Sequence, residues 1–224
     1  MINWLHSKLY RPEKGWDPVP REHARRYADA EWEKLDESCL DKIEEWLGVF
    51  EGKRVLDLGG GPGQFSVAMA RRGARVTWHD VSRIYQQFAE EKARRAGVSI
   101  SWSLGYLDEA LRLGEGGFDL VFNRICWYYA ISDRDFSRVV WRLLKGGGVG
   151  YIDSNNASFN HGKMSLSMRL RTRLNEMGGG VKIGHPHPPR GRIAHLFNQL
   201  PVEKMLADYS VSTNDRVIFI KAKS

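Results

Sequence analysis

A strand that ends in an acidic residue and runs directly into a glycine-rich turn is the feature that most constrains the fold of this chain. Residues 54–58 are apolar around Asp57, and glycine then recurs at every second position, at Gly59, Gly61 and Gly63. Glycine adopts backbone angles that other residues avoid, and it lets the main chain approach a ligand closely. The pattern therefore predicts a strand, a tight ligand-binding turn and a helix, in that order.

Short apolar segments alternate with amphipathic ones after this turn. We expect further strands over residues 74–79, 98–104, 119–122 and 149–153, and helices ending at residue 72 and spanning 82–96 and 133–144. Such alternation predicts parallel strands joined by right-handed crossovers, with helices on both faces of the sheet. Two closing segments, 209–212 and 216–221, flank a short turn and predict an antiparallel hairpin at the sheet edge.

Two parts of the chain fall outside this alternation. Residues 1–48 combine an arm with three prolines, residues 1–20, and an apolar helical stripe over 21–47 that stops at Gly48. We expect them to form an N-terminal arm and helices that cap a domain over residues 49–224. The alternation lapses again between residues 154 and 200, which predicts an insert in that domain.

Composition limits the class of protein. A chain of 224 residues that is 42% hydrophobic and 27% charged is typical of a folded domain. Two cysteines, Cys39 and Cys126, exclude a disulfide scaffold and a cysteine-rich zinc module, and indicate reduced thiols in the cytoplasm. No run approaches the roughly 20 apolar residues that a membrane span needs.

The net charge of +7 is unevenly distributed. Residues 161–224 hold 11 basic and 4 acidic side chains, so this part carries the whole excess. A localised basic segment can attract an anionic substrate, a membrane surface or nucleic acid, and it can equally be a solvated helix face with a basic loop.

A second acidic residue, Asp80, ends the next predicted strand. A carboxylate at this place can accept hydrogen bonds from both ribose hydroxyls of a nucleoside. A dinucleotide site would need a third glycine where Gln64 or Ser66 stands, and Asp57 would repel a pyrophosphate. A ligand with a positive amino group, a ribose and no phosphate suits the pattern better.

Three motifs together resemble those of the class I S-adenosylmethionine-dependent methyltransferases. The D-x-G-x-G-x-G run resembles their first motif, residues 78–82 their acidic motif after the second strand, and residues 143–147 their turn before the fifth strand, with Lys145 in place of proline. The resemblance covers roughly residues 50–155. It implies an α/β fold with a Rossmann-like, doubly wound, seven-stranded sheet that is mostly parallel with an antiparallel C-terminal strand. It also implies S-adenosylmethionine as cofactor and no catalytic metal.

The resemblance further implies a cofactor site. It assigns the methionine moiety to Asp57 and the glycine turn, the ribose to Asp80 and the adenine to Val81. The family often places a carboxylate on the adenine amine after the third strand, whereas this chain has Tyr106 there. Either Tyr106 or Asp108 is expected to substitute, and Asp108 is equally compatible with a helix N-cap. The full predicted set is Asp57, Gly59, Gly60, Gly61, Gly63, Asp80, Val81, Tyr106, Leu107, Asn123 and Tyr27, the last resembling a tyrosine with which related enzymes cover the cofactor.

The acceptor side is predicted after the fourth strand. The sequence there lacks the two prolines that follow this strand in nucleic-acid amine methyltransferases, which argues against base methylation. The next three residues, Trp127, Tyr128 and Tyr129, predict an aromatic wall for a planar or apolar acceptor, and core packing explains at least one of them as well.

The insert supplies candidate bases. His185 and His187 lie in a proline-rich loop, where no third metal ligand is evident and one histidine could act as a base near neutral pH. His195 is a substrate contact in one interpretation and a structural histidine in the other. We assign catalysis to His185, His187 and Tyr128, and substrate binding to Trp127, Tyr129, Arg190, Arg192 and His195.

The resulting hypothesis is a cytoplasmic methyltransferase for an anionic or lipophilic small molecule, with oxygen favoured over nitrogen as the methylated atom. It loosely resembles quinone-pathway O-methyltransferases. Two alternatives stay open. An RNA methyltransferase that uses the basic segment 163–192 predicts binding with a steep salt dependence. A non-catalytic cofactor-binding module predicts binding without turnover. An apolar stripe through residues 166–177 either packs on the domain, which we favour, or lies on an anionic membrane.

Overall fold

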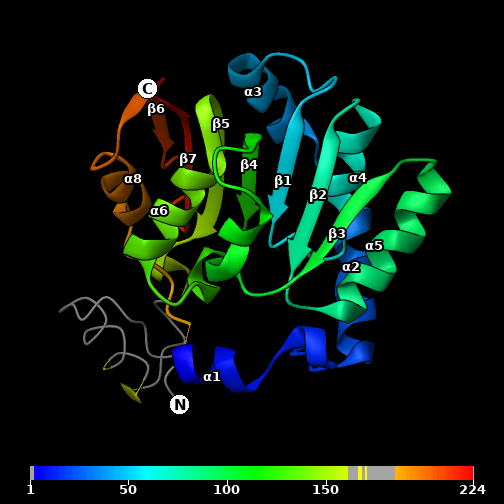
Figure 1. Ribbon diagram of the computed structural model, residues 1–224. Coiled ribbons are helices and arrows are strands. Elements are labelled where there is room, and N and C mark those ends of the chain that lie inside the picture. The colour runs from blue at the N-terminus through cyan, green and yellow to red at the C-terminus, as the bar shows by residue number, and fades with distance from the viewer. Residues whose placement is uncertain (1–2, 161–165, 168–169, 171–184, 224) are drawn as a thin grey trace.

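One seven-stranded sheet organises the chain (Figure 1). The computed structural model describes residues 3–160, 166–167, 170 and 185–223. The strand order is β3-β2-β1-β4-β5-β7-β6; the first five strands of the chain run parallel, and β7 is antiparallel to both of its neighbours. The strands are β1 (Arg54–Leu58), β2 (Arg75–Asp80), β3 (Ile100–Leu104), β4 (Phe118–Arg124), β5 (Leu144–Asn155), β6 (Val202–Asp208) and β7 (Asn214–Lys221). The predicted fold class is confirmed.

Helices cover both faces of this sheet (Figure 1). They are α1 (Asn3–Leu9), α2 (Arg21–Glu33), α3 (Ser38–Leu47), α4 (Gln64–Arg71), α5 (Arg83–Ala96), α6 (Asp133–Leu143) and α8 (Arg192–Phe197), with short 3-10 helices η1 (Pro12–Lys14), η2 (Leu107–Leu113), η3 (Trp127–Tyr129) and η4 (Ala157–Asn160). One apolar cluster lies between the sheet and the α6–α8 side. A second joins the opposite face to α3 and α4. The sheet is therefore buried on both sides, as parallel strands require.

Local signals account for the element ends near the glycine turn. Helix α5 begins after Ser82, whose Oγ accepts a hydrogen bond from the amide of Tyr85, and ends at Gly97 with a φ of +70°. Serine at the N-cap and left-handed glycine at the C-terminus are both preferred, because they satisfy backbone groups that the helix leaves unpaired.

Several predicted elements differ in extent from the observed ones; the strand expected at 149–153, for example, is β5, residues 144–155. The hairpin strand expected at 209–212 is β6, residues 202–208; its outer position and mostly exposed or half-buried side chains leave little hydrophobic alternation to recognise. The single helix expected over 21–47 is two helices, broken where Asp36 accepts hydrogen bonds from the amide and hydroxyl of Ser38. This side-chain turn competes with the helical hydrogen bonds.

The parallel strands end at one edge of the sheet, and the first residues of the chain lie across that edge (Figure 1). Tyr106, just after β3, donates its hydroxyl hydrogen bond to the backbone oxygen of Tyr10 at 2.6 Å. Ligands of open α/β sheets bind outside the carboxyl ends of the strands. The N-terminal residues therefore cover the edge at which a site is expected.

Candidate functional site

The glycine turn after β1 has the shape that the sequence predicts. Gly59, Gly61 and Gly63 have φ values of +83°, +49° and +80°, all in the region that side chains disfavour. A Cβ atom on Gly59 would lie 2.2 Å from Cys126 Sγ, and one on Gly60 would lie 2.2 Å from a ring carbon of Trp78. A Cβ atom on Gly61 would have no heavy atom within 4 Å. The turn is closely packed on its inner side and open at Gly61.

Asp80 ends β2 beside this turn. Its carboxylate accepts hydrogen bonds from the amides of Gly61 at 3.0 Å and Ser82 at 2.9 Å. Burial raises the pKa of this carboxyl group, while the two backbone hydrogen bonds act in the opposite direction. The structure thus places Asp80 beside Gly61, at the open side of the glycine turn.

Asp57 lies under the turn with its carboxylate inside the protein. It is 3% exposed and accepts a hydrogen bond of 2.6 Å from Ser66 Oγ in α4. Burial raises the pKa of Asp57 to about 7. This geometry ties β1 to α4, so Asp57 positions the turn, a role that the sequence did not indicate.

The end of β4 contributes a buried amide and a strained residue. Asn123 Nδ2 donates to the backbone oxygen of Leu58 at 2.7 Å and lies 2.8 Å from Cys126 Sγ, while Oδ1 is buried and has no hydrogen-bond partner. Ile125 has a φ of +56°, which is unusual for a β-branched residue. Its amide donates to the oxygen of Asp153 at 2.7 Å. Backbone strain of this kind concentrates at functional sites.

Two residues of η3, Tyr128 and Tyr129, form a cluster with His185 and His187. The ring of Tyr128 lies 4.4 Å from that of Tyr129 and 4.4 Å from that of His187. Tyr129 lies 5.0 Å from His185, and Phe159 lies 5.6 Å from His187. The structure therefore brings His185 and His187 to two of the three predicted aromatic residues. Burial raises the pKa of Tyr128 far above its ordinary value, so its hydroxyl stays protonated at neutral pH.

Trp127 is not part of this cluster, so the prediction that it belongs to the aromatic wall is wrong. It is fully buried, its indole nitrogen donates to Asp133 at 2.9 Å, and its ring packs on Phe136 and Phe197. Three consecutive residues in a tight turn point in different directions, and Trp127 is the one that faces the core.

Arg190, Arg192 and His195 lie at and along α8. The Arg190 guanidinium donates to the backbone oxygen of Tyr209 at 2.8 Å and covers its ring. His195 is exposed and lies 2.8 Å from the side chain of Gln199. Arg192 is half-buried at the first position of α8. The contacts of Arg190 and His195 are local to their own part of the fold, so their predicted substrate contacts have no structural support here.

Of the remaining predicted cofactor residues, Leu107 and Val81 lie near the turn or Asp80, and Tyr27 packs on α5. Leu107 is buried near Gly59, and Val81 is half-buried between Asp80 and Ser82. Tyr27 is 39% exposed, with its ring 5.8 Å from that of Tyr85. Burial raises the pKa of Tyr27 to about 12.

Asp108 contacts a different element from the one expected. Its carboxylate accepts hydrogen bonds from the amide of Ile131 at 3.0 and 3.2 Å, so it fixes η2 to the segment before α6. No side chain caps η2, so the predicted N-cap is wrong, while the predicted contact with adenine stays a prediction.

Sequence reasoning missed the arm residues that bind the loops after β2 and β3. Arg11 forms a two-pronged ion pair with Glu109 in η2, at 2.6 and 3.0 Å. Asp17 accepts hydrogen bonds from Ser82 Oγ and the amide of Ile84. Contacts over such chain distances leave no local pattern.

Other predictions fall elsewhere or outside the described residues. The basic residues Lys163, Arg169, Arg171, Arg173 and Lys182, and the stripe positions Leu174 and Met177, lie outside them. In the part of the chain that the structure describes, no group of three His, Cys, Asp or Glu side chains could hold a metal ion. No described helix has the length and apolar character needed to cross a bilayer.

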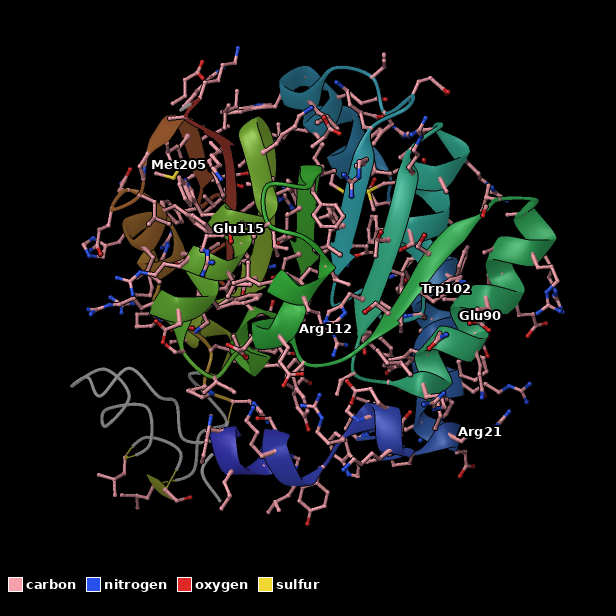
Figure 2. The ribbon with its side chains drawn as sticks, viewed as in Figure 1. Arg21, Glu90, Trp102, Arg112, Glu115 and Met205 are labelled. Atoms are coloured by element: carbon pink, nitrogen blue, oxygen red, sulfur yellow. The ribbon has the colours of Figure 1, made fainter. Side chains whose placement is uncertain are left out.

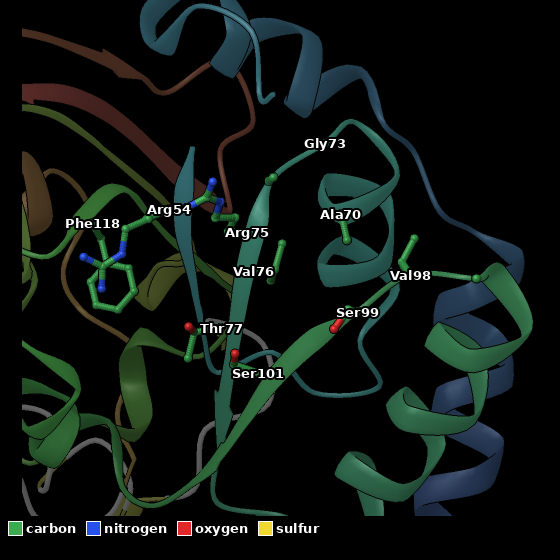
Figure 3. A pocket seen from close by; sticks show the side chains of 12 residues that line it. Arg54, Ala70, Gly73, Arg75, Val76, Thr77, Val98, Ser99, Ser101 and Phe118 are labelled. Carbon is green, nitrogen blue, oxygen red and sulfur yellow. The ribbon is translucent and has the colours of Figure 1, made fainter. Parts of the chain in front are cut away.

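A pocket of about 600 Å³ lies at the opposite edge of the sheet (Figure 3). It is lined by the amino ends of the first three strands, including Arg54 and Arg75, and by Phe118. It contains none of the predicted site residues, and we do not include it in the site.

Comparison with known proteins agrees with this geometry. Residues 55–148 match the family model described as a methyltransferase domain. The ubiquinone biosynthesis O-methyltransferase of Alkalilimnicola ehrlichii is 38% identical over 109 residues, which cover 49% of this chain and 44% of that protein. The enzyme of the same name from Rhizobium leguminosarum bv. trifolii is 26% identical over 165 residues, covering 73% and 61%. The chain thus spans about half the length of the curated relatives it matches.

Solved structures share the fold at low identity. A putative S-adenosylmethionine-dependent methyltransferase from Methanococcus maripaludis has a TM-score of 0.65 and 16% identity, covering 91% of this chain and 94% of that one. The [4+2]-cyclase SpnF has a TM-score of 0.62 and 16% identity, covering 84% and 81%. The topology and the glycine turn define a Rossmann-like α/β fold. Within it, residues 55–148 are similar to a methyltransferase domain.

Proposed function

We propose that the chain is an enzyme that transfers the methyl group of S-adenosylmethionine to a small-molecule acceptor, at oxygen rather than nitrogen. The observation that carries this proposal is the joint position of two groups of residues. The turn at Gly61 with Asp80, and the cluster of Tyr128 with His187, follow strands that end at the same edge of the sheet. The relatives from ubiquinone biosynthesis are named O-methyltransferases, which supports oxygen as the methylated atom.

The residues at the turn fit a ligand with a ribose and an amino group. Asp80 would accept hydrogen bonds from the ribose hydroxyls. Asn123 Oδ1 and Gln64 Oε1 are buried acceptors without a partner, and a ligand ammonium would supply the missing donors. When bound, S-adenosylmethionine supplies an electrophilic methyl group on a positively charged sulfur. Asp57 acts indirectly: its carboxylate accepts the hydrogen bond from Ser66 and so holds β1 against α4.

The cluster of Tyr128 and Tyr129 in η3 with His185 and His187 would bind and deprotonate the acceptor. Tyr128 keeps its proton at neutral pH, as any tyrosine does, and burial raises its pKa further, so we assign it a hydrogen bond to the acceptor oxygen. The proton of the acceptor hydroxyl would pass to a histidine, and His187 is nearest to Tyr128. Tyr129 and His185 would line the same side. Holding the acceptor in line can lower the barrier by about 7–11 kcal/mol, so positioning is the larger part of the expected contribution.

Two further expectations belong to this proposal. Cys39 and Cys126 are both free thiols, which supports a reducing compartment such as the cytoplasm. The acceptor is expected to be planar or apolar, because aromatic rings line the cluster.

The test is a transfer assay with S-adenosylmethionine carrying a labelled methyl group and a panel of phenols, catechols, carboxylic acids and amines. We expect labelled product from a hydroxyl acceptor. His187→Ala should lower kcat by about 100- to 10,000-fold, the usual contribution of a general base. His23→Ala, on the exposed side of α2, is the matched control and should leave kcat unchanged. Cofactor binding without turnover on any acceptor would contradict the proposal.

A further inference from the structure

The cavity at the amino ends of β1, β2 and β3 lies at the opposite edge of the sheet from the glycine turn (Figure 3). Its volume of about 600 Å³ is within the range of small-molecule sites, which is roughly 300–1,000 Å³. The polar side chains that line it can all donate hydrogen bonds; they are Arg54, Arg75, Thr77, Ser99 and Ser101. The described lining includes no Asp or Glu, so the cavity favours an anion.

The alternation of side chains along β2 and β3 explains why these donors share one face of the sheet. Trp102 of β3, labelled in Figure 2, has its ring centroid 5.6 Å from that of Trp78 in β2, on the face that α4 and α5 cover. Successive side chains of a strand point to opposite faces, so Arg75, Thr77 and Ser101 face the other way. Ser101 is exposed and Thr77 is half-buried, so the cover on that face is incomplete at the outer strands.

Arg54 and Arg75 lie on neighbouring strands at this face. They are register partners in the parallel strands β1 and β2, whose backbones run about 4.8 Å apart. Two positive charges on neighbouring strands repel each other, which destabilises the sheet. Among the described residues, neither guanidinium has a carboxylate partner, and Glu51, which lies against Gly73, forms no ion pair with them. An anion in the cavity would offset this repulsion.

The surroundings of Arg54 orient its side chain without using its charge. The guanidinium carbon lies 5.5 Å from the centroid of the Phe118 ring, and a Cβ atom on Gly117 would lie 3.5 Å from one of its terminal nitrogens. The backbone amide of Arg54 donates to Asp119 at 2.9 Å, and the carboxylate of Asp119 forms its ion pair with Lys145. Arg54 is therefore held by a ring and by its main chain, and its guanidinium can donate to a ligand.

We propose that this cavity is a second small-molecule site, which binds a phosphate group through Arg54 and Arg75. A phosphate monoester and free phosphate each carry up to two negative charges near neutral pH, which matches two guanidinium groups, and arginine forms charge-assisted hydrogen bonds with phosphate oxygens. The hydroxyls of Thr77 and Ser101 supply further donors, and the ring of Phe118 can contact the organic part of an ester. The site is separate from the glycine turn, so the inference does not depend on the proposed methyl transfer.

The first test titrates the wild-type protein with phenyl phosphate at constant ionic strength and follows the amide resonances by NMR. We expect saturable shifts at residues 75–77 and 99–101. Phenyl sulfate, which has the same shape and one charge fewer, should bind more weakly. Inorganic phosphate distinguishes the two sources of the group: equal affinity indicates free phosphate, and weaker binding indicates an organic ester. No saturation up to about 10 mM phenyl phosphate, shifts confined to other parts of the chain, or equal affinity for phenyl sulfate would overturn the inference.

The second test compares variants that each lose one positive charge. Arg75→Gln and Arg54→Gln should each weaken the binding of phenyl phosphate by about 10- to 100-fold, the loss expected for a hydrogen bond to a charged group. Arg25→Gln is the matched control, because Arg25 is exposed on α2. Arg75→Gln should unfold at the same temperature as the wild type or at a higher one, because one of two repelling charges is gone. Equal affinities of Arg75→Gln and Arg25→Gln for phenyl phosphate would overturn the inference.

Discussion

The carboxylate of Asp80 accepts a hydrogen bond from the backbone amide of Gly61, with 3.0 Å between Oδ2 and N. The preceding residue, His79, accepts hydrogen bonds through its backbone oxygen from the amides of Gly59 and Gly60 at 2.7 and 3.2 Å. The end of β2 therefore fixes the turn that follows β1. Asp80 therefore shapes the glycine turn where we propose that the cofactor binds.

Substitutions in the glycine turn should differ in cost according to their surroundings. Gly59→Ala places a methyl group 2.2 Å from Cys126 Sγ at a φ of +83°. Overpacking costs about 1–3 kcal/mol and backbone strain about 1–2 kcal/mol. We therefore predict that the free energy of unfolding falls by roughly 3 kcal/mol. In Gly61→Ala the added methyl group lies in open space. Only backbone strain then lowers the free energy of unfolding, by about 1–2 kcal/mol. Urea unfolding of both variants measures this difference, and equal losses would contradict the packing described.

Asp57 should make the unliganded protein less stable as the pH rises. Its pKa is raised from 3.8 to about 7 by burial, so the folded state holds a proton that the unfolded state releases between these values. The free energy of unfolding should fall over this range, by about 4 kcal/mol at most. Asp57→Asn, which can still accept from Ser66, should lack this fall. Unfolding curves of the wild type, Asp57→Asn and the exposed control Asp29→Asn from pH 4 to 7 measure this fall. If the free energy of unfolding changes with pH equally in all three proteins, the prediction is wrong.

His79 should have the opposite effect over nearly the same range. Burial lowers its pKa from 6.5 to about 4, so the unfolded state binds the extra proton between these values. Its contribution to stability therefore increases with pH from about 4 to 6.5, by about 3 kcal/mol at most. In His79→Gln this increase should be absent, so that the decline from Asp57 becomes steeper. A slope unchanged from wild type would show that His79 does not titrate as described.

Asp17 should stabilise the start of α5 from a distance in sequence. It accepts from the amide of Ile84, one of the helix donors without an intrahelical partner. Asp17→Ala should cost about 0.5–2 kcal/mol, the usual range for a lost cap. Hydrogen exchange at Ile84 should become faster in this variant and stay unchanged in Asp29→Ala. Unchanged exchange in both would mean that the arm does not cap the helix.

The sequence predicts the fold and the centre of the cofactor site because their signals are local. The strand before Asp57, the spacing of Gly59, Gly61 and Gly63, and the acid at the end of β2 are each contained in a few consecutive residues, and the structure places them together. Hydrophobic periodicity was sufficient for the central strands, which are buried on both faces.

What could not be predicted depends on contacts between distant segments. Trp127 and Tyr128 are neighbours in the chain, yet one enters the core and the other faces His187. The anchoring of the arm depends on ion pairs such as Arg11 with Glu109, which no sequence pattern encodes.

Calorimetric titration with S-adenosylhomocysteine tests the central claim most directly. We predict one site on the wild-type protein, and binding weakened about 10- to 100-fold in Asp80→Ala, because a ribose hydroxyl then loses a charged acceptor. Asp29→Ala, on the exposed side of α2, should bind as the wild type does. An affinity of Asp80→Ala equal to that of the wild type, or no binding by the wild type, would contradict the account.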